Sequence, residues 1–326
     1  MSSVFQTHAW QGSWWETYGD TEGFTLTQEW DGKTSGLYEA RYTLKGLPVR
    51  SIQFVGTAHR TISTPRTEYN CFTGPEESPE SVFRAVSNAL KSKSWTEAAL
   101  CDVKVESPDY RALQKLAAQE GWVWRSLSSD CSYSVDTRGE FSHYLASLGS
   151  NSRLKLFNRR KILESLGRIT VVDAESAERD RFLEKLDEFH RARWGRPCFG
   201  GEKGMKFQKA FLERLPDERG KPMLSVMSWE GEPISVLYNV LHNGRIYNIQ
   251  GGFKPDFHKK LALGTLHLGY CIEQAFTDEQ VQCFDMLAGT GKNENYKSRI
   301  ANQHEQVESV MLVRSLPFKL LYRVKG

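Results

Sequence analysis

The chain has 326 residues, of which 39% are hydrophobic and 25% are charged, and its formal net charge is +3 at pH 7. This length allows two domains of ordinary size, or one domain with long insertions, and the apolar content is enough for large cores. The composition excludes a disordered chain. So small a net charge also excludes a dedicated nucleic-acid binder, although a local basic patch could still hold a polyanion.

The sequence lacks the patterns of export, membrane insertion and metal binding. Residues 1–10 show no basic start followed by an apolar core, and no segment approaches the ~18 uninterrupted apolar residues of a membrane span. Six cysteines are scattered without a C-x-x-C pair, and eight histidines show no H-E-x-x-H spacing. We therefore expect a cytoplasmic protein with reduced thiols, no membrane span and no metal, whose oligomeric state stays open.

The first half of the chain predicts alternating helices and strands. Aromatic residues at helical spacing predict a helix over residues 5–18. Ser78-Pro79 and Ser107-Pro108 each place a capping serine before a proline, which is how two further helices begin. Strands are expected at 24–30, 37–44, 50–55, 95–105, 122–127 and 132–135.

A similar order of elements follows in the second half. Residues 141–166 predict a helical connection that carries Arg153, Lys155, Arg159, Arg160 and Lys161. Beyond it we expect a strand at 169–173, helices at 177–193 and 206–214, strands at 223–229, 234–242 and 245–250, a helix at 264–276, and strands at 282–287 and 307–313. This order predicts an α/β (mixed α+β) fold with domains at 1–150 and 151–326, in which 151–166 is the linking helix.

Motifs spread over nearly the whole chain carry a family resemblance. In chain order they are Phe5, Trp10 and Trp14; Arg153 and Arg159-Arg160; His190-Arg-Ala-Arg-Trp194; Tyr247 and Gly251-Gly252-Phe253-Lys254-Pro255; Gly264; Phe284-Asp285-Met286-Leu287 with Gly289; and Tyr296-Lys297. They resemble the GNAT superfamily, specifically the CelD/BcsL-type cellulose-biosynthesis acetyltransferases, which are related to the FemAB-like aminoacyltransferases. The resemblance implies two tandem GNAT-like domains, each a mixed, largely antiparallel sheet flanked by helices, with catalysis in the second.

The resemblance also implies acetyl-CoA or another acyl-CoA as co-substrate. GNAT enzymes bind its pyrophosphate on backbone N–H groups where their main helix begins. The matching residues here are Lys259, Lys260, Leu263, Gly264 and Thr265. The segment departs from the usual Q/R-x-x-G-x-G/A loop, because Lys259 replaces Gln or Arg and Ala262 replaces the first glycine. Alternatively, Gly264 only begins a helix and the lysines form a solvated edge.

Acyl transfer requires a base, a donor to the carbonyl oxygen and an acid for the leaving thiolate. The resemblance gives Asp285 and His190 as base or substrate anchor, Tyr296 as acid or acceptor-orienting group, and Lys297 as a stabiliser of negative charge. Asp285 could instead cap a strand end, and His190 could be a half-buried helix histidine. If the protein is an enzyme, Tyr296→Phe and Asp285→Asn are expected to abolish turnover.

Three further features are candidates for binding the acceptor. Arg193 and Trp194 would form a cationic and aromatic wall for a sugar or acidic acceptor, or else a solvated helix face. Gly251, Gly252 and Phe253 would let the backbone approach a ligand closely, or form a β-bulge. The cations of residues 153–161 could hold a nucleotide-linked sugar or the acceptor arm of a tRNA, although such helix faces are usually only solvated.

The resulting hypothesis is transfer of an acetyl or other acyl group from acyl-CoA to an amine or hydroxyl of a sugar or amino sugar in envelope or exopolysaccharide metabolism. One alternative is a FemAB-like aminoacyltransferase that uses aminoacyl-tRNA, which the imperfect loop and basic linker favour and the small net charge disfavours. A second alternative is a tandem-GNAT scaffold that binds without catalysis. The basic, amphipathic run at residues 318–323 is too short to predict a membrane segment.

Overall fold

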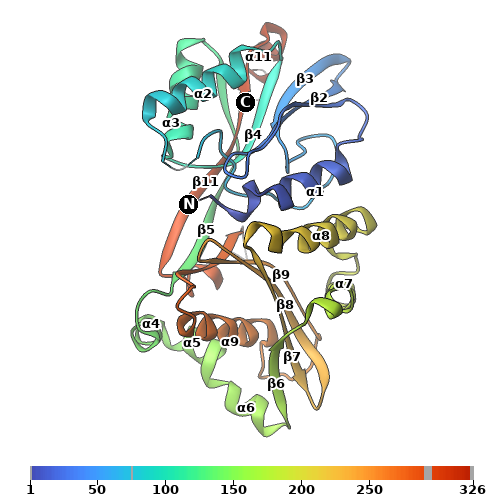
Figure 1. Cartoon of the computed structure of the whole chain (residues 1–326), viewed down its shortest axis with the longest axis vertical. Coiled ribbons are helices and arrows are strands. Elements are labelled where there is room, and N and C mark those ends of the chain that lie inside the picture. The colour runs from blue at the N-terminus through green and yellow to red at the C-terminus, as the bar shows by residue number, and fades with distance from the viewer. Residues whose placement is uncertain (1, 75, 290–295, 324–326) are drawn as a thin grey trace. The chain divides into compact units, whose positions relative to one another are not determined.

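The computed structural model describes residues 2–74, 76–289 and 296–323, which divide into two compact units (Figure 1). Unit 1 takes in the chain up to residue 130, residues 206–211, and the chain from residue 305 onward. Unit 2 takes in residues 131–205 and 212–304. The C-terminal segment thus belongs with the first unit, unlike the predicted ranges 1–150 and 151–326. None of the described helices is long and apolar enough to cross a membrane.

The strands of unit 1 lie in the order β1-β2-β3-β4-β11-β5, with helices against them. Its strands are β1 (Phe24–Gln28), β2 (Leu37–Leu44), β3 (Leu47–Phe54), β4 (Glu97–Lys104), β5 (Val123–Asp136) and β11 (Gln303–Val313). Its helices are η1 (Val4–Gln6), α1 (His8–Tyr18), α2 (Pro79–Lys91), α3 (Pro108–Gln119) and α11 (Leu316–Arg323). As predicted, the Ser78 and Ser107 side chains cap α2 and α3.

Two predictions about the strands were wrong. The segments predicted at 122–127 and 132–135 are one continuous strand, β5. The last strand does not complete the second half, because β11 pairs antiparallel with β4 and matches Val313 with Glu97. Apolar residues of β4 and β11 join those of α2 and α3 in one buried core, so burial rather than proximity in sequence selects this partner.

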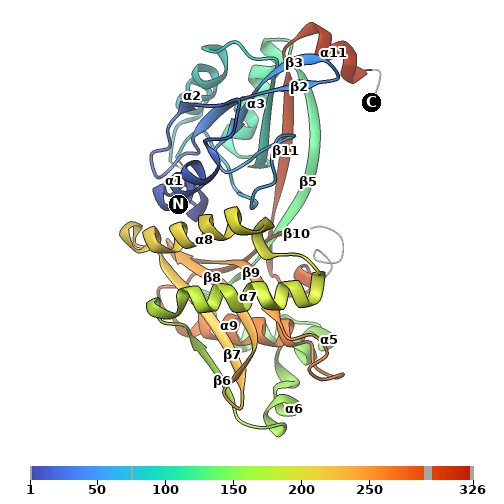
Figure 2. The same ribbon diagram turned by 90° about the vertical axis from the view of Figure 1, so that its right-hand side faces the viewer.

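Unit 2 continues from the C-terminal part of β5 in the order β5-β10-β9-β8-β7-β6. Its other strands are β6 (Ile169–Asp173), β7 (Lys221–Trp229), β8 (Glu232–His242), β9 (Arg245–Phe253) and β10 (Cys283–Gly289). Its main helices are α7 (Arg179–Trp194) and α9 (Leu263–Thr277), which cover the two faces of the sheet (Figure 2). Each face of this sheet is therefore buried under a helix.

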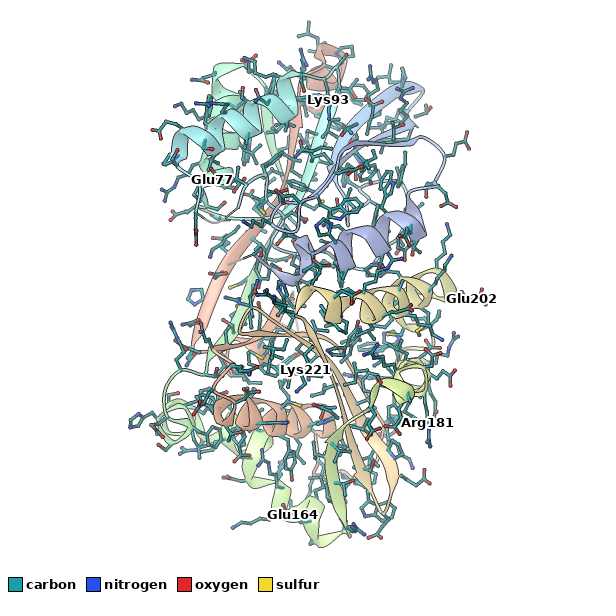
Figure 3. The ribbon with its side chains drawn as sticks, in the orientation of Figure 1. Glu77, Lys93, Glu164, Arg181, Glu202 and Lys221 are labelled. Carbon is teal, nitrogen blue, oxygen red and sulfur yellow. The ribbon has the colours of Figure 1, made fainter. Side chains whose placement is uncertain are left out.

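The predicted helical connection over 141–166 is interrupted. It consists of α4 (Phe141–Ser147), α5 (Ser150–Arg153), the π-helical η2 (Leu154–Asn158) and α6 (Arg160–Ser165). The break after α4 occurs where Leu148 is extended, with ψ 138°. Side chains such as Glu164 on α6 and Arg181 on α7 are exposed (Figure 3). The remaining elements are η3 (Ser176–Glu178), η4 (Cys198–Gly200), η5 (Leu215–Glu218) and α8 (Glu202–Arg214), which contributes residues to both units.

Candidate functional site

The strands β9 and β10 of unit 2 run parallel but separate along their length. They pair at Cys283 with Arg245, Phe284 with Ile246 and Asp285 with Tyr247. Beyond this point β9 remains paired with β8 as far as Phe253, whereas β10 follows β5. Within the described residues no pairing joins β9 and β10 past Tyr247, so the two strands part and leave backbone polar groups facing the gap.

An irregularity in each strand accompanies the separation. In β9 the register with β8 shifts between Asn248 and Gln250, so Ile249 has no paired partner. In β10 the register with β5 shifts between Asp285 and Ala288, and Leu287 has a φ of +61°. A left-handed leucine is unfavourable by about 1–2 kcal/mol, so the surrounding contacts must hold it.

Asp285 supplies one of those contacts. Its side chain is fully buried, and its Oδ1 accepts a hydrogen bond from the backbone N–H of Leu287 at 2.8 Å. Its Oδ2 accepts from Nη1 of Arg245 at 2.8 Å, which pairs the buried charge. These contacts place Asp285 as a carboxylate that fixes the bulge of β10, and they favour the strand-capping alternative over the predicted base.

Lys297, which follows β10 in the sequence, contacts the same part of that strand. Its buried ammonium donates to the carbonyl oxygens of Leu287 at 3.0 Å and Ala288 at 2.9 Å. The N–H groups of Ile300 and Ala301 both bond to the Lys297 carbonyl oxygen, so the lysine begins a helical turn. This geometry favours positioning of β10 over the predicted stabilisation of a substrate charge.

The N-terminus of α9 lies in the segment that follows β9. Ala262 is its N-cap residue and provides no side-chain acceptor. Within the described part of the chain, the N–H groups of Leu263, Gly264 and Thr265 have no acceptor. Lys259 and Lys260, both exposed, precede them. The predicted cofactor-binding residues thus form one segment in which free N–H groups and two cations favour an anion.

Two glycines let the helices approach β9. A Cβ on Gly264 would lie 2.8 Å from the Phe253 ring, and one on Gly252 would lie 3.0 Å from Cβ of Phe189 on α7. Gly252 therefore permits close packing of α7. A Cβ on Gly251 would meet Leu237 at 2.8 Å. The bulge of β9 lies at Ile249, before the predicted segment, and Gly251, Gly252 and Phe253 pair with β8 in regular register.

Arg193, Trp194, Phe253 and Tyr296 come together around one guanidinium. The Arg193 guanidinium carbon lies 4.5 Å from the Phe253 ring centroid and 4.7 Å from that of Trp194. Desolvation raises the pKa of Tyr296, and the nearby Arg193 charge opposes this shift. Both Trp194 and Tyr296 remain partly exposed, so this cluster presents aromatic surface, a cation and a protonated phenol to solvent.

His190 lies one turn before this cluster on α7. Its Nδ1 is 2.9 Å from the carbonyl oxygen of Arg196, just past the left-handed cap residue Gly195. Because a carbonyl only accepts, Nδ1 carries the hydrogen, so in the neutral ring it is Nε2 that has the lone pair. This tautomer suits a base, and the same bond suits a residue that fixes the end of α7.

His267, which the sequence reasoning missed, lies in the apolar α9 and is fully buried. Ser225 on β7 bonds its Nε2 at 3.0 Å, and its Nδ1 bonds Ser235 on β8 at 2.9 Å. Ser235 in turn donates to the carbonyl oxygen of Gly252 at 3.3 Å. Burial lowers the pKa of His267 to about 3, so it is neutral in this chain of bonds. A polar residue within the apolar run at 266–268 was the available signal.

Arg160 of the basic linker packs against α9 within unit 2. Its guanidinium carbon lies 3.7 Å from the Tyr270 ring centroid, and it forms an ion pair with Glu273 on α9. One of the five predicted cations is therefore a packing residue between α6 and α9. Across the described ranges, no three His, Cys, Asp or Glu side chains form a group that could hold a metal ion.

Several solved structures share this fold at low sequence identity. FemX is 13% identical with a TM-score of 0.57, covering 96% of this chain and 93% of its own. The structure of L-PGS from Bacillus licheniformis is 14% identical with a TM-score of 0.52, covering 95% and 94%. A C-terminal domain assigned to a lysylphosphatidylglycerol synthetase from Agrobacterium fabrum is 10% identical with a TM-score of 0.56, covering 99% and 91%.

No curated protein sequence matches the chain. A family model described as an acetyltransferase (GNAT) domain matches residues 150–298, which include β9, α9 and β10. The mixed sheet flanked by helices agrees with GNAT-like folds, as predicted. The matched domain supports an acyltransferase, and it coincides with the part of the chain in which the separated strands and the candidate residues lie.

Proposed function

We propose that unit 2 transfers an acyl group from acyl-CoA to an amine or hydroxyl acceptor. The observation that carries this proposal is the separation of β9 and β10 beside the uncapped start of α9. An extended thioester arm would bond to backbone groups exposed where the strands part. The pyrophosphate would accept from the N–H groups of residues 263–265, assisted by the charges of Lys259 and Lys260.

In the proposed chemical step, each transferred proton has a named donor or acceptor. The acceptor nitrogen or oxygen attacks the thioester carbonyl carbon, and the C–S bond breaks as the new bond is completed. Tyr296 gives its proton to the departing thiolate, and its raised pKa keeps the phenol protonated at neutral pH. Nε2 of His190 is the candidate acceptor of the proton that the nucleophile loses. Asp285 and Lys297 act by positioning β10.

For the acceptor, we propose a sugar or amino sugar of the cell envelope or an exopolysaccharide, with acetyl as the acyl group. The Arg193 cluster supports this choice, because aromatic rings stack on sugar rings and a guanidinium bonds their hydroxyl or acidic groups. The resemblance to CelD/BcsL-type acetyltransferases supports the same class. Release of free thiol from acetyl-CoA in the presence of amino sugars would measure this activity.

Binding of CoA tests the donor site directly. Titration calorimetry with the full chain should give a measurable Kd that rises about tenfold in Lys259→Gln/Lys260→Gln, since each exposed charge contributes ~0.5–1 kcal/mol. Arg181→Gln removes an exposed charge from α7 and should leave the Kd unchanged (Figure 3). Absence of CoA binding to the unmodified chain, or equal affinity in the double variant, would refute the proposed donor site.

A second candidate is transfer from aminoacyl-tRNA. The observation that favours it is the departure of the α9 loop from the acyl-CoA pattern at Lys259 and Ala262. Solved structures titled FemX and L-PGS share the fold, and the linker still offers Arg153, Lys155, Arg159 and Lys161 to an anion. Mass spectrometry of ligands that copurify with the chain separates the two: bound CoA supports the first candidate, and bound RNA supports the second.

A further inference from the structure

We propose that unit 1 binds anionic phospholipid surfaces through α11 and the tip of the β2–β3 hairpin. The α11 face is defined here as Lys45, Leu47, Leu316, Lys319 and Leu320. In both views α11 lies beside the far end of this hairpin (Figures 1 and 2). Leu44 near the tip packs against the same cluster as Phe318 and Tyr322 of α11, so the two elements form one continuous surface.

The α11 face exposes large apolar side chains to solvent. Leu316 is 72% exposed and Leu320, one turn later, is 62% exposed. Leu47 at the hairpin tip is exposed as well. Residues four apart lie on the same side of a helix, so the two leucines of α11 form one stripe. An adjacent pair of exposed leucines beside a third marks a contact surface more strongly than isolated ones do.

The outward direction of these leucines is fixed by the other side of α11. Phe318 and Tyr322 are buried. The Tyr322 hydroxyl donates to Oε2 of the buried Glu97 at 2.7 Å, and Arg125 donates to the Tyr322 carbonyl oxygen at 2.9 Å. Rotating α11 to bury Leu316 would break these bonds and leave Glu97 with fewer partners. The leucines therefore stay outward and need an external apolar phase to be buried.

The charges near the leucines indicate which kind of apolar phase would cover them. Residues 41–50 contain Arg41, Lys45 and Arg50 and no Asp or Glu. Residues 314–322 contain Arg314 and Lys319 and no Asp or Glu. Lys45, Arg314 and Lys319 thus accompany the exposed leucines, whereas Arg41 and Arg50 project from the hairpin face opposite Leu44 and α11. Cations beside apolar side chains complement a bilayer surface with negative headgroups, and they oppose burial against a second copy of the same positive face.

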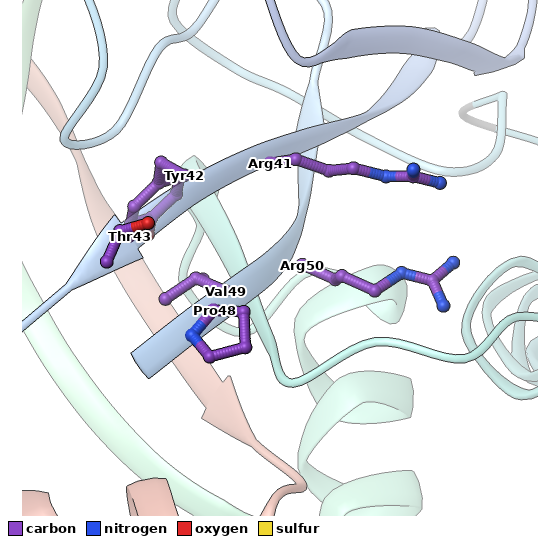
Figure 4. A pocket seen from close by; sticks show the side chains of 6 residues that line it. All are labelled: Arg41, Tyr42, Thr43, Pro48, Val49 and Arg50. Carbon is purple, nitrogen blue, oxygen red and sulfur yellow. The ribbon is translucent and has the colours of Figure 1, made fainter. Parts of the chain in front are cut away.

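An open hollow lies on the face of the hairpin opposite Leu44 and α11. It has a volume of about 460 Å³ and is lined by Arg41, Tyr42, Thr43, Pro48, Val49 and Arg50 (Figure 4). Arg41 and Arg50 are cross-strand partners whose side chains extend in the same direction, and both bond to Glu39. Both guanidinium groups are therefore already paired and face away from α11, so the proposed lipid contact does not use them.

The exposed leucines and the cations beside them together meet the requirement for stable peripheral binding. One weak apolar anchor gives marginal membrane affinity, whereas an apolar anchor combined with basic residues gives a stable complex. Each cation near an anionic surface contributes ~1 kcal/mol, which is about fivefold in affinity, and salt screens this part. Binding should therefore need both negative lipid and the leucines. This inference concerns unit 1 alone and stands whether or not acyl transfer is correct.

Cosedimentation of the full chain with lipid vesicles tests the proposal. Vesicles of phosphatidylcholine with about 30 mol% phosphatidylglycerol should bind the chain at ~50 mM salt, and pure phosphatidylcholine vesicles should not. Leu316→Ser/Leu320→Ser should weaken binding at least about tenfold, and Lys45→Gln/Lys319→Gln about 25-fold. Val172→Ser, which replaces an exposed apolar residue of unit 2, is the matched control and should bind like the unmodified chain.

Circular dichroism and thermal unfolding establish that each variant is folded before its binding is compared. The proposal is overturned if the unmodified chain ignores phosphatidylglycerol, if both vesicle types bind equally, or if the leucine variant binds as well as the control. Light scattering gives one more decisive outcome. A dimer that the leucine variant abolishes, without any vesicle binding, would assign the α11 face to contact between copies instead.

Discussion

Gly269 on α9 offers a direct test of how the helix is seated. A Cβ at this position would lie 2.2 Å from the carbonyl oxygen of Leu156 and 2.9 Å from its carbonyl carbon. Real Cβ atoms essentially never come within 3.0 Å of another heavy atom. To bring the contact with the Leu156 oxygen from 2.2 Å to this limit, α9 and η2 would have to move apart by about 0.8 Å. The obstacle is backbone, which cannot rotate away as a side chain can.

The expected effect of Gly269→Ala is a loss of stability despite a better helix-forming residue. Overpacking costs ~1–3 kcal/mol, and replacing glycine by alanine inside a helix returns at most ~1 kcal/mol. We therefore expect unit 2 to lose ~1–2 kcal/mol in its free energy of unfolding, measured as a lower urea midpoint. The displaced helix also moves residues 263–265, so the Kd for CoA should rise.

Gly139→Ala is the matched control for this substitution. No heavy atom lies within 4 Å of a Cβ added at Gly139, and its φ is not in the left-handed region. Its urea midpoint should stay close to that of the unmodified chain, because the new methyl group meets no neighbour. A Gly269→Ala variant as stable as the control would refute the close contact between α9 and η2.

Three further outcomes follow from the site. Tyr296→Phe should lower kcat by about 10²–10⁴ with little change in the Kd for CoA, and an unchanged kcat in the thiol-release assay would remove Tyr296 from the reaction. Asp285→Asn should cost ~2 kcal/mol or more in unfolding free energy because Arg245 loses its buried partner, while the pH dependence of kcat stays as it was; a shifted profile would restore the base role. Since the folded-state pKa of His267 is below its unfolded value, stability should be complete above pH ~6.5 and fall by ~1.4 kcal/mol per pH unit below it. In His267→Gln the free energy of unfolding should change less between pH 7 and 5. Urea titrations at several pH values that give the same pH dependence for both proteins would contradict the buried neutral histidine.

Much of the local structure was predictable, because its causes lie within a few residues. The serine caps before Pro79 and Pro108 begin α2 and α3 where the sequence places them. The order of β9, α9 and β10 also follows the predicted segments. Hydrophobic periodicity and capping act over one or two turns, so a single sequence reveals them.

The partners of segments distant in sequence were not predictable in the same way. Nothing near β11 indicates that it pairs with β4, about two hundred residues earlier, because strand pairing depends on the whole core. The burial of Asp285 with Arg245 depends on the alignment of two strands, and the sequence alone places Asp285 only at a strand end. The convergence of Arg193, Phe253 and Tyr296 likewise appears only after three distant segments are folded.

The position of β11 also determines when unit 1 can be finished during synthesis. This strand lies between β4 and β5 in the sheet, yet it is synthesised only after all the strands of unit 2 from β6 to β10. Until it arrives, β4 and β5 each present an unpaired edge that invites aggregation. A chain cut short before residue 303 would keep both edges open, so we expect nascent unit 1 to need protection by chaperones until β11 has been synthesised.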